Sequence, residues 1–94
     1  MIRFTFSPAA QRDMAEIWLY SADNWGADQA DGYVQQIEHD LVAAANGSPL
    51  VRPLDRYWRI KSGHHLCVFR KDSSGGIVVV RVLHERMDVK SQLR

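Results

Sequence analysis

Apolar side chains recur every three or four positions over the first half of the chain, which is the period of an amphipathic helix. One run extends from Ser7-Pro8, a typical helix start, to about Ala22. A second run extends from about Ala27 to Ala45 and ends at Asn46-Gly47, a typical helix stop. The connection between the runs is short, so the pattern predicts two helices packed as an antiparallel hairpin.

The second half of the chain changes to strand-like patterning. Three runs rich in β-branched and aromatic residues, Tyr57–Lys61, His65–Arg70 and Ile77–His84, are separated by gaps typical of hairpins. The last run is apolar on both faces, as expected of a central strand. A short alternating segment at residues 2–6 predicts one more strand at the N-terminus, and the stretch through Pro53 is expected to be irregular.

This order of elements, β-α-α-β-β-β, predicts an α+β fold. The helical hairpin would pack on one face of a mainly antiparallel sheet of three to four strands. A chain of 94 residues fills one core, so residues 1–94 are expected to form a single domain. The opposite face of the sheet would then be uncovered, and small domains commonly use such a face for binding.

Charge is distributed unevenly along the chain, although the formal net charge is only +1. Residues 13–40 hold seven acids and no base, whereas residues 52–94 hold ten bases and four acids. The low net charge gives no support to non-specific nucleic-acid binding. The basic half instead suggests a surface for an acidic protein partner or for phosphates.

Few other features carry chemistry. Cys67, the single cysteine, stands in an apolar run and is interpreted as a buried side chain in a reducing compartment. No apolar segment approaches the length of a membrane span and no signal peptide is recognisable, so a cytoplasmic protein is expected. His64 and His65 are adjacent, so a strand would separate them, and no third ligand is suitably spaced. Neither a metal nor a cofactor is therefore predicted.

An ordered set of short segments resembles the ParE-type toxins of the RelE/ParE superfamily. The set covers nearly the whole chain and keeps the family's spacing. Its members are Ser7-Pro8-Ala9-Ala10, Glu16-Ile17-Trp18 with Tyr20, Trp25-Gly26, Gln29-Ala30 and Tyr33 in the helical half, and Ser62-Gly63-His64-His65-Leu66, Val68-Phe69-Arg70, Arg81-Val82-Leu83-His84, Arg86-Met87-Asp88 and Leu93 in the second half.

The resemblance implies the toxin of a type II toxin–antitoxin system, a class associated with plasmid stabilisation and growth inhibition. DNA gyrase is then the expected target, and a ParD-like antitoxin the expected neutralising partner. The antitoxin is expected to be acidic and to fold on binding, laying a helix along the hairpin and a strand on the sheet edge. Operator DNA would be bound by the complex through the antitoxin, and the toxin itself would not be an enzyme.

Two groups of side chains are candidates for these contacts. Aromatic and arginine side chains are enriched at interface hot spots, and those predicted to bind the antitoxin are Trp18, Trp25, Tyr57, Trp58, Arg59 and Arg70. By the resemblance, the basic tail lies near the end that engages the target, and the residues predicted to bind it are Arg81, His84, Arg86 and Met87. For Trp18 and Trp25 the favoured interpretation of the pattern is a core role in which they hold the hairpin together, with antitoxin binding as the other.

A ribonuclease is the alternative, because the fold is shared with RelE-type toxins that cut mRNA on the ribosome. Such cleavage needs a base, a proton donor and cations around the phosphate. His84 or Glu85 could be the base, with Arg70 and Arg81 as the clamp. RelE-type enzymes generally add a tyrosine or histidine near the end of the chain, and residues 87–94 contain neither. A third possibility is a non-toxic module that only binds the antitoxin.

Strand alternation gives one further expectation for the basic cluster. Side chains two positions apart on a strand share a face. Arg59 and Lys61 should therefore lie together. Arg81 should share the face of Ile77, Val79 and Leu83, with His84 pointing the other way.

Overall fold

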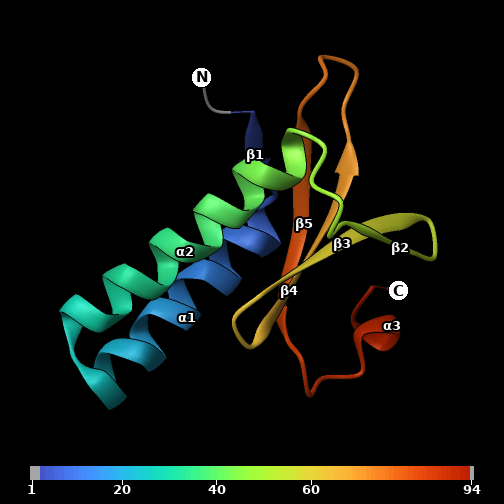
Figure 1. Cartoon of the computed structure of the whole chain (residues 1–94). Coiled ribbons are helices and arrows are strands. Elements are labelled where there is room, and N and C mark those ends of the chain that lie inside the picture. Colours follow the sequence, from blue (N-terminus) through green and yellow to red (C-terminus); the bar gives the residue numbers. More distant parts are fainter. Residues whose placement is uncertain (1–2, 94) are drawn as a thin grey trace.

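A computed structural model describes residues 3–93 (Figure 1). The predicted order of elements is confirmed, with one extra strand and a short C-terminal helix. Neither of the two long helices is apolar enough over its length to cross a membrane, and no other helix within residues 3–93 qualifies. The elements are β1 (Phe4–Phe6), α1 (Pro8–Trp25), α2 (Ala27–Ala45), β2 (Arg52–Leu54), β3 (Tyr57–Ser62), β4 (His65–Lys71), β5 (Ile77–His84) and α3 (Val89–Gln92).

The sheet has five strands in the order β1-β5-β4-β3-β2, rather than the predicted three to four. β1 pairs parallel with β5, and the other neighbours are antiparallel. The strand that the sequence did not predict is β2, in the stretch through Pro53 that was expected to be irregular. A three-residue strand with a central proline carries no readable alternation. It forms because it lies at the sheet edge, where a missing amide donor is tolerated.

The two long helices form the predicted hairpin, and local chemistry sets their ends. Ser7 caps α1, because its Oγ accepts the backbone N–H of Ala10 at 3.1 Å and donates to the carbonyl of Val80 at 2.9 Å. Gly26 separates α1 from α2 with a φ of 95°, a backbone conformation that favours glycine. α1 therefore continues to Trp25, beyond the end near Ala22 that the sequence predicted.

The hydrophobic core lies between this hairpin and one face of the sheet (Figure 1). Both helices and the three longest strands contribute to it, and α3 lies across the sheet from the hairpin. Cys67 is buried in this core, as predicted, and burial raises the pKa of its thiol to about 12. The principal core residues are Ala10, Ile17, Ile37, Leu41, Ile60, Cys67, Phe69, Ile77, Val79 and Val82.

A bulge in β5 changes which side chains face the helices. Val68 of β4 stands opposite Arg81 and Phe69 stands opposite Val79, so Val80 is left without a partner. The core-facing positions therefore run Ile77, Val79 and then Val82. The prediction that Arg81 shares a face with Ile77 and Val79 was wrong, because strict alternation does not account for the extra residue, Val80, in β5. His84 was likewise predicted to point away from this face and lies toward the helices instead.

Candidate functional site

A groove of about 690 Å³ opens between the tip of the helical hairpin and the nearer end of the sheet. We call it the tip groove. Three of its side chains are apolar or aromatic and yet largely exposed: Tyr20 at 64%, Trp25 at 63% and Met87 at 48%. Large exposed apolar side chains that gather in one concavity mark binding surfaces. The groove is lined by Glu16, Ile17, Tyr20, Ser21, Trp25, Gln29, Tyr33, His64, His65, His84 and Met87.

Tyr33 of α2 holds the turn between β3 and β4 against the helices. Its hydroxyl accepts the backbone N–H of His64 at 3.0 Å and lies 2.6 Å from Nδ1 of His65. The hydroxyl thus bonds the backbone of one histidine and the ring of the next. Gly63 makes the close approach possible, since a Cβ there would lie 2.8 Å from the tyrosine oxygen.

His65 is held in its neutral form near neutral pH. Burial and, after it, the neighbouring His84 and His64 lower the pKa of its imidazole from 6.5 to about 4. The rings of His65 and His84 meet edge to face with centroids 5.3 Å apart. Burial also raises the pKa of Tyr33. Tyr33 and His65 therefore pack at the floor of the groove as neutral side chains that are hydrogen-bonded to each other.

Glu85 is bonded to His64, which lines the tip groove. Its carboxylate accepts from His64 Nδ1 at 2.8 Å and from Lys61 Nζ at 3.1 Å. These two donors lower the pKa of Glu85 to about 2. A carboxylate whose oxygens are already occupied and whose pKa is this low is a weak general base.

Arg81 is engaged within the fold. Its guanidinium binds the carboxylate of Asp13 on α1 through two bonds of 2.7 and 3.0 Å, and Asp13 also accepts the backbone N–H of Val82 at 2.9 Å. β1 pairs only with residues 77–79 of β5, so Asp13 satisfies the strand edge beyond the end of β1. The hydrogen bond that Arg81 donates to Asp13 raises the pKa of Arg81.

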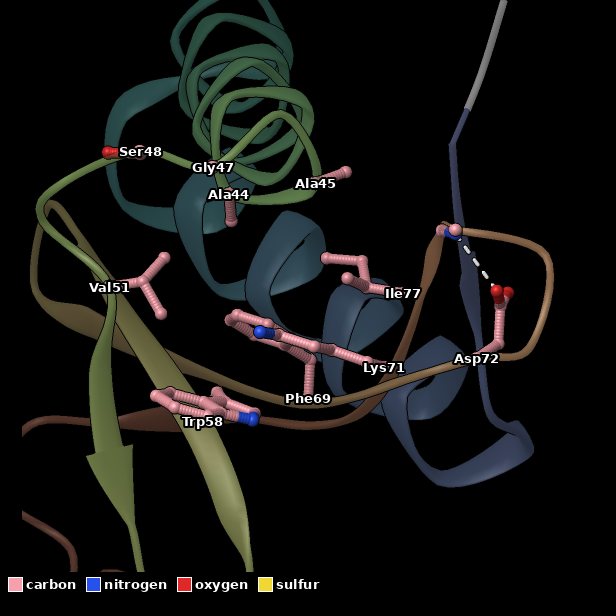
Figure 2. A pocket seen from close by; sticks show the side chains of 12 residues that line it. Ala44, Ala45, Gly47, Ser48, Val51, Trp58, Phe69, Lys71, Asp72 and Ile77 are labelled. Carbon is pink, nitrogen blue, oxygen red and sulfur yellow. Dashed lines mark hydrogen bonds between the residues drawn. The ribbon is translucent and has the colours of Figure 1, made fainter.

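The structure distributes the predicted antitoxin-binding residues over four places. Trp25 lines the tip groove, whereas Trp18 lies between the helices and donates from Nε1 to Asp31 at 2.8 Å. Trp58 lines a second pocket at the other end of the sheet (Figure 2). The three remaining residues are Tyr57, Arg59 and Arg70. They alternate with neighbours that face the core, so they lie on the sheet face away from the helices. Lys61 lies on the same face as Arg59, as predicted.

The predicted target-binding residues are brought together only in part. His84 and Met87 line the tip groove, next to Trp25 from the antitoxin set. Arg86 is exposed at the same end of β5, and its backbone N–H donates to Nδ1 of His84 at 3.2 Å. Arg81 points to Asp13 instead. The tip groove thus contains residues that the sequence analysis assigned to two different partners, Trp25 to the antitoxin and His84 and Met87 to the target.

Sequence reasoning missed several residues that build this region. Asp13 and Asp31 had no local signal beyond their place in an acidic segment, and Tyr33, although part of the family-like set of segments, had no contact predicted for its hydroxyl. Each of the three side chains is hydrogen-bonded to a residue more than ten positions away in the chain, and its role depends on that contact. No group of three or more His, Cys, Asp or Glu side chains within residues 3–93 is arranged to hold a metal ion.

The chain has relatives along its whole length. Residues 4–89 match the family described as ParE toxin of type II toxin-antitoxin system, parDE. A curated protein named Toxin ParE1, from Mycobacterium tuberculosis, is 40% identical over 95 residues that cover 97% of each chain. Another Toxin ParE1, from Caulobacter vibrioides, is 28% identical over 94 residues that cover 96% of each chain.

Structures of known proteins share the fold. A chain from the chromosomal ParDE toxin–antitoxin system of P. aeruginosa superposes with a TM-score of 0.71 at 17% identity, covering 89% of this chain and 96% of the other. A chain from the YoeB–YefM complex of Staphylococcus aureus gives 0.61 at 20% identity, covering 89% and 97%. With the family match and the 40% identical relative, these findings show that the chain belongs to the ParE toxin family of type II toxin–antitoxin systems.

Proposed function

We propose that this toxin inhibits DNA gyrase by binding it in the cytoplasm, without catalysing a reaction, and that an acidic ParD-like antitoxin neutralises it. One observation carries the first part. The tip groove exposes apolar side chains, while Tyr33 and the three histidines that line it are hydrogen-bonded within the protein. Such a surface gains free energy by burying apolar area on a partner. Operator DNA would be bound by the complex through the antitoxin.

The ribonuclease alternative is less well supported by the geometry. Its clamp would need Arg70 and Arg81 to converge on a phosphate near His84. Arg81 is paired with Asp13, and Arg70 stands opposite Val78 near the far end of β5, whereas His84 stands opposite His65 at the near end. Glu85, the other candidate base, is held by Lys61 and His64. These placements favour binding over catalysis.

The family relationship supports an antitoxin as partner, and the charge distribution supports an acidic one. The segment from residue 52 to residue 71 carries six bases and one acid, and it forms the β2–β4 side of the sheet. A basic surface speeds the encounter with an acidic, flexible segment. The helical hairpin carries the opposite charge, so the antitoxin's acidic part is expected on the strands.

Purified toxin added to a gyrase supercoiling reaction tests the proposal. The wild-type protein is expected to inhibit supercoiling. Met87→Glu, which places a charge in the tip groove, is expected to lose inhibition. Arg12→Glu serves as the control because it changes an exposed residue of α1 outside the groove.

The rival functions give different results in the same experiment and in cells. A wild-type toxin that leaves gyrase active but cuts ribosome-bound mRNA would contradict the proposal and indicate the RelE-like enzyme. In that case His84→Ala should abolish cleavage while antitoxin binding survives. A chain that binds the antitoxin tightly yet never slows growth at any expression level would be the non-toxic module.

A further inference from the structure

A second concavity lies at the opposite end of the sheet from the tip groove. It is a pocket of about 470 Å³ between the C-terminal end of α2 and the strands β3 and β4 (Figure 2). We call it the Trp58 pocket. Phe69 is fully buried beneath it, and Trp58 and Val51 form a half-buried apolar wall. The pocket therefore offers an apolar floor that is open to solvent.

One cation stands over this floor. Lys71 Nζ lies 4.5 Å from the centre of the Trp58 ring, and Figure 2 shows the lysine side chain extending across the pocket over Phe69, with Trp58 next to it. Lys71 is exposed, so the contact is a surface cation–π interaction, worth about 0.5–1 kcal/mol. An interaction this weak can be exchanged for a carboxylate supplied by a partner.

The surroundings of the pocket define what kind of partner fits. Lys71 is the base among the residues that line the pocket, and the strands β2 to β4 around it are basic as a whole, with six bases and one acid over residues 52–71 on both faces of the sheet; residues 13–40 of the hairpin carry seven acids and no base. The local acid, Asp72, is occupied by its own turn, because its Oδ1 accepts the N–H groups of Ser74 and Gly76 at 2.9 Å each. An acidic segment is attracted to this end of the molecule and repelled from the hairpin tip.

We propose that the Trp58 pocket is the anchor site for the acidic antitoxin: one large apolar side chain enters the pocket, and a neighbouring carboxylate takes Lys71 from the Trp58 ring. The inference rests on the proposed neutralisation by an acidic antitoxin and deepens it. It also separates the two partners in space. The antitoxin is anchored at the Trp58 pocket, and the tip groove is left to be covered by another part of the antitoxin or to meet the target.

The test measures binding of a ParD-like antitoxin to the full-length toxin, by surface plasmon resonance. Lys71→Glu is expected to weaken binding by about 10–100-fold, because it sets like charges against each other. Lys71→Met removes the charge alone and is expected to weaken binding by about two- to five-fold, as for an exposed ion pair. Arg12→Glu, on α1, is the matched charge reversal away from the pocket.

Rate constants separate a local contact from long-range attraction. Both charge reversals slow association at low salt, and that effect disappears above about 0.5 M salt because long-range fields are screened. Only Lys71→Glu is expected to speed dissociation, and that effect should persist at high salt. Equal dissociation rates for the two variants would overturn the inference.

Trp58 supplies the second arm, and a conservative variant guards against misfolding. Trp58→Ala is expected to weaken binding by more than about 30-fold, as for a buried aromatic hot spot. Trp58→Phe keeps the apolar wall and should restore most of the affinity. Full affinity in both Lys71→Glu and Trp58→Ala, with affinity lost in Trp25→Ala, would place the anchor in the tip groove and overturn the inference while leaving the proposed function intact.

Two further outcomes have separate meanings. A wild-type toxin that does not bind the antitoxin at all would remove the proposed neutralisation, and the inference with it. A toxin whose self-association is lost in Trp58→Ala while its antitoxin binding is unchanged would make the pocket an interface between two copies of this chain. That result would also overturn the inference.

Discussion

The two ends of the sheet differ in how their charged and polar side chains are bonded. On the side of the tip groove, Asp13, Tyr33, Glu85 and their partners are closed into internal bonds, and apolar groups face the solvent. At the Trp58 pocket the exposed cation Lys71 rests on an aromatic ring. A surface of the first kind selects a partner by shape and apolar area, whereas one of the second kind selects it by charge. The following predictions test this difference.

The largest effect is expected from Asp13→Ala. The variant leaves Arg81 without its carboxylate partner and the backbone N–H of Val82 without its acceptor. The side chains of Asp13 and Arg81 are only 11% and 27% exposed, respectively. Breaking such a pair from one side costs about 3–5 kcal/mol. Urea denaturation should show this loss in the free energy of unfolding.

The double variant Asp13→Leu with Arg81→Met is the control for that prediction. It removes both charges together and should recover part of the stability. A single Asp13→Ala variant as stable as the wild type would show that the tip-groove side does not depend on its internal bonds.

Gly63→Ala is expected to rank second. The residue has a φ of 58°, and an added Cβ would lie 2.8 Å from the hydroxyl of Tyr33. The variant should cost about 1–3 kcal/mol, because a strained backbone is combined with a displaced side chain. Gly47→Ala is the matched control: its φ is 86°, but a Cβ there meets nothing within 4 Å, so it should lose less. Thermal or urea unfolding of both variants measures the difference.

Acidification should weaken the fold through His65. Its pKa is about 4 in the folded protein against 6.5 for an ordinary histidine, so below pH 6.5 the unfolded chain binds a proton that the folded one does not. Stability should therefore fall as the pH is lowered from about 6.5 to about 4, by on the order of 1–2 kcal/mol after allowance for partial solvent exposure.

His65→Gln should flatten the stability curve within this pH window. Glu85 also loses stabilising bonds in acid, but its pKa is lowered from 4.5 to about 2, so its contribution falls in a lower range. Urea denaturation at pH 7 and pH 5 distinguishes the two groups. An unchanged slope in His65→Gln would mean that another group titrates there.

The smallest effect is expected from Trp25→Ala. This side chain is 63% exposed and touches Tyr20 edge to face, with centroids 5.9 Å apart. The variant should change stability by less than about 0.5 kcal/mol, as for most surface substitutions. Trp58→Ala, whose side chain packs against the core, should cost about 2–3 kcal/mol. Equal losses in the two variants would contradict the assignment of Trp25 to a binding surface.

Local sequence patterns determined the order of elements. Ser7-Pro8 and Asn46-Gly47 mark a helix start and a helix stop, and the apolar periods between them place the helices. These signals act within a few residues, so they can be read without knowing the fold. The candidate residues His84, Met87 and Trp25 were also recognisable from the sequence, because family segments surround them. What could not be read was that these three meet in one groove.

Only the tertiary structure decided which side chains face which partner. The unpaired Val80 rotates the end of β5 relative to its start, which sends Arg81 to Asp13 and His84 to the groove. β2 exists because β3 is there to pair with it, and Lys71 is positioned by the Trp58 ring across the strand pair. Each of these outcomes depends on contacts between segments far apart in the chain, and the periodicity within a segment contains no information about them.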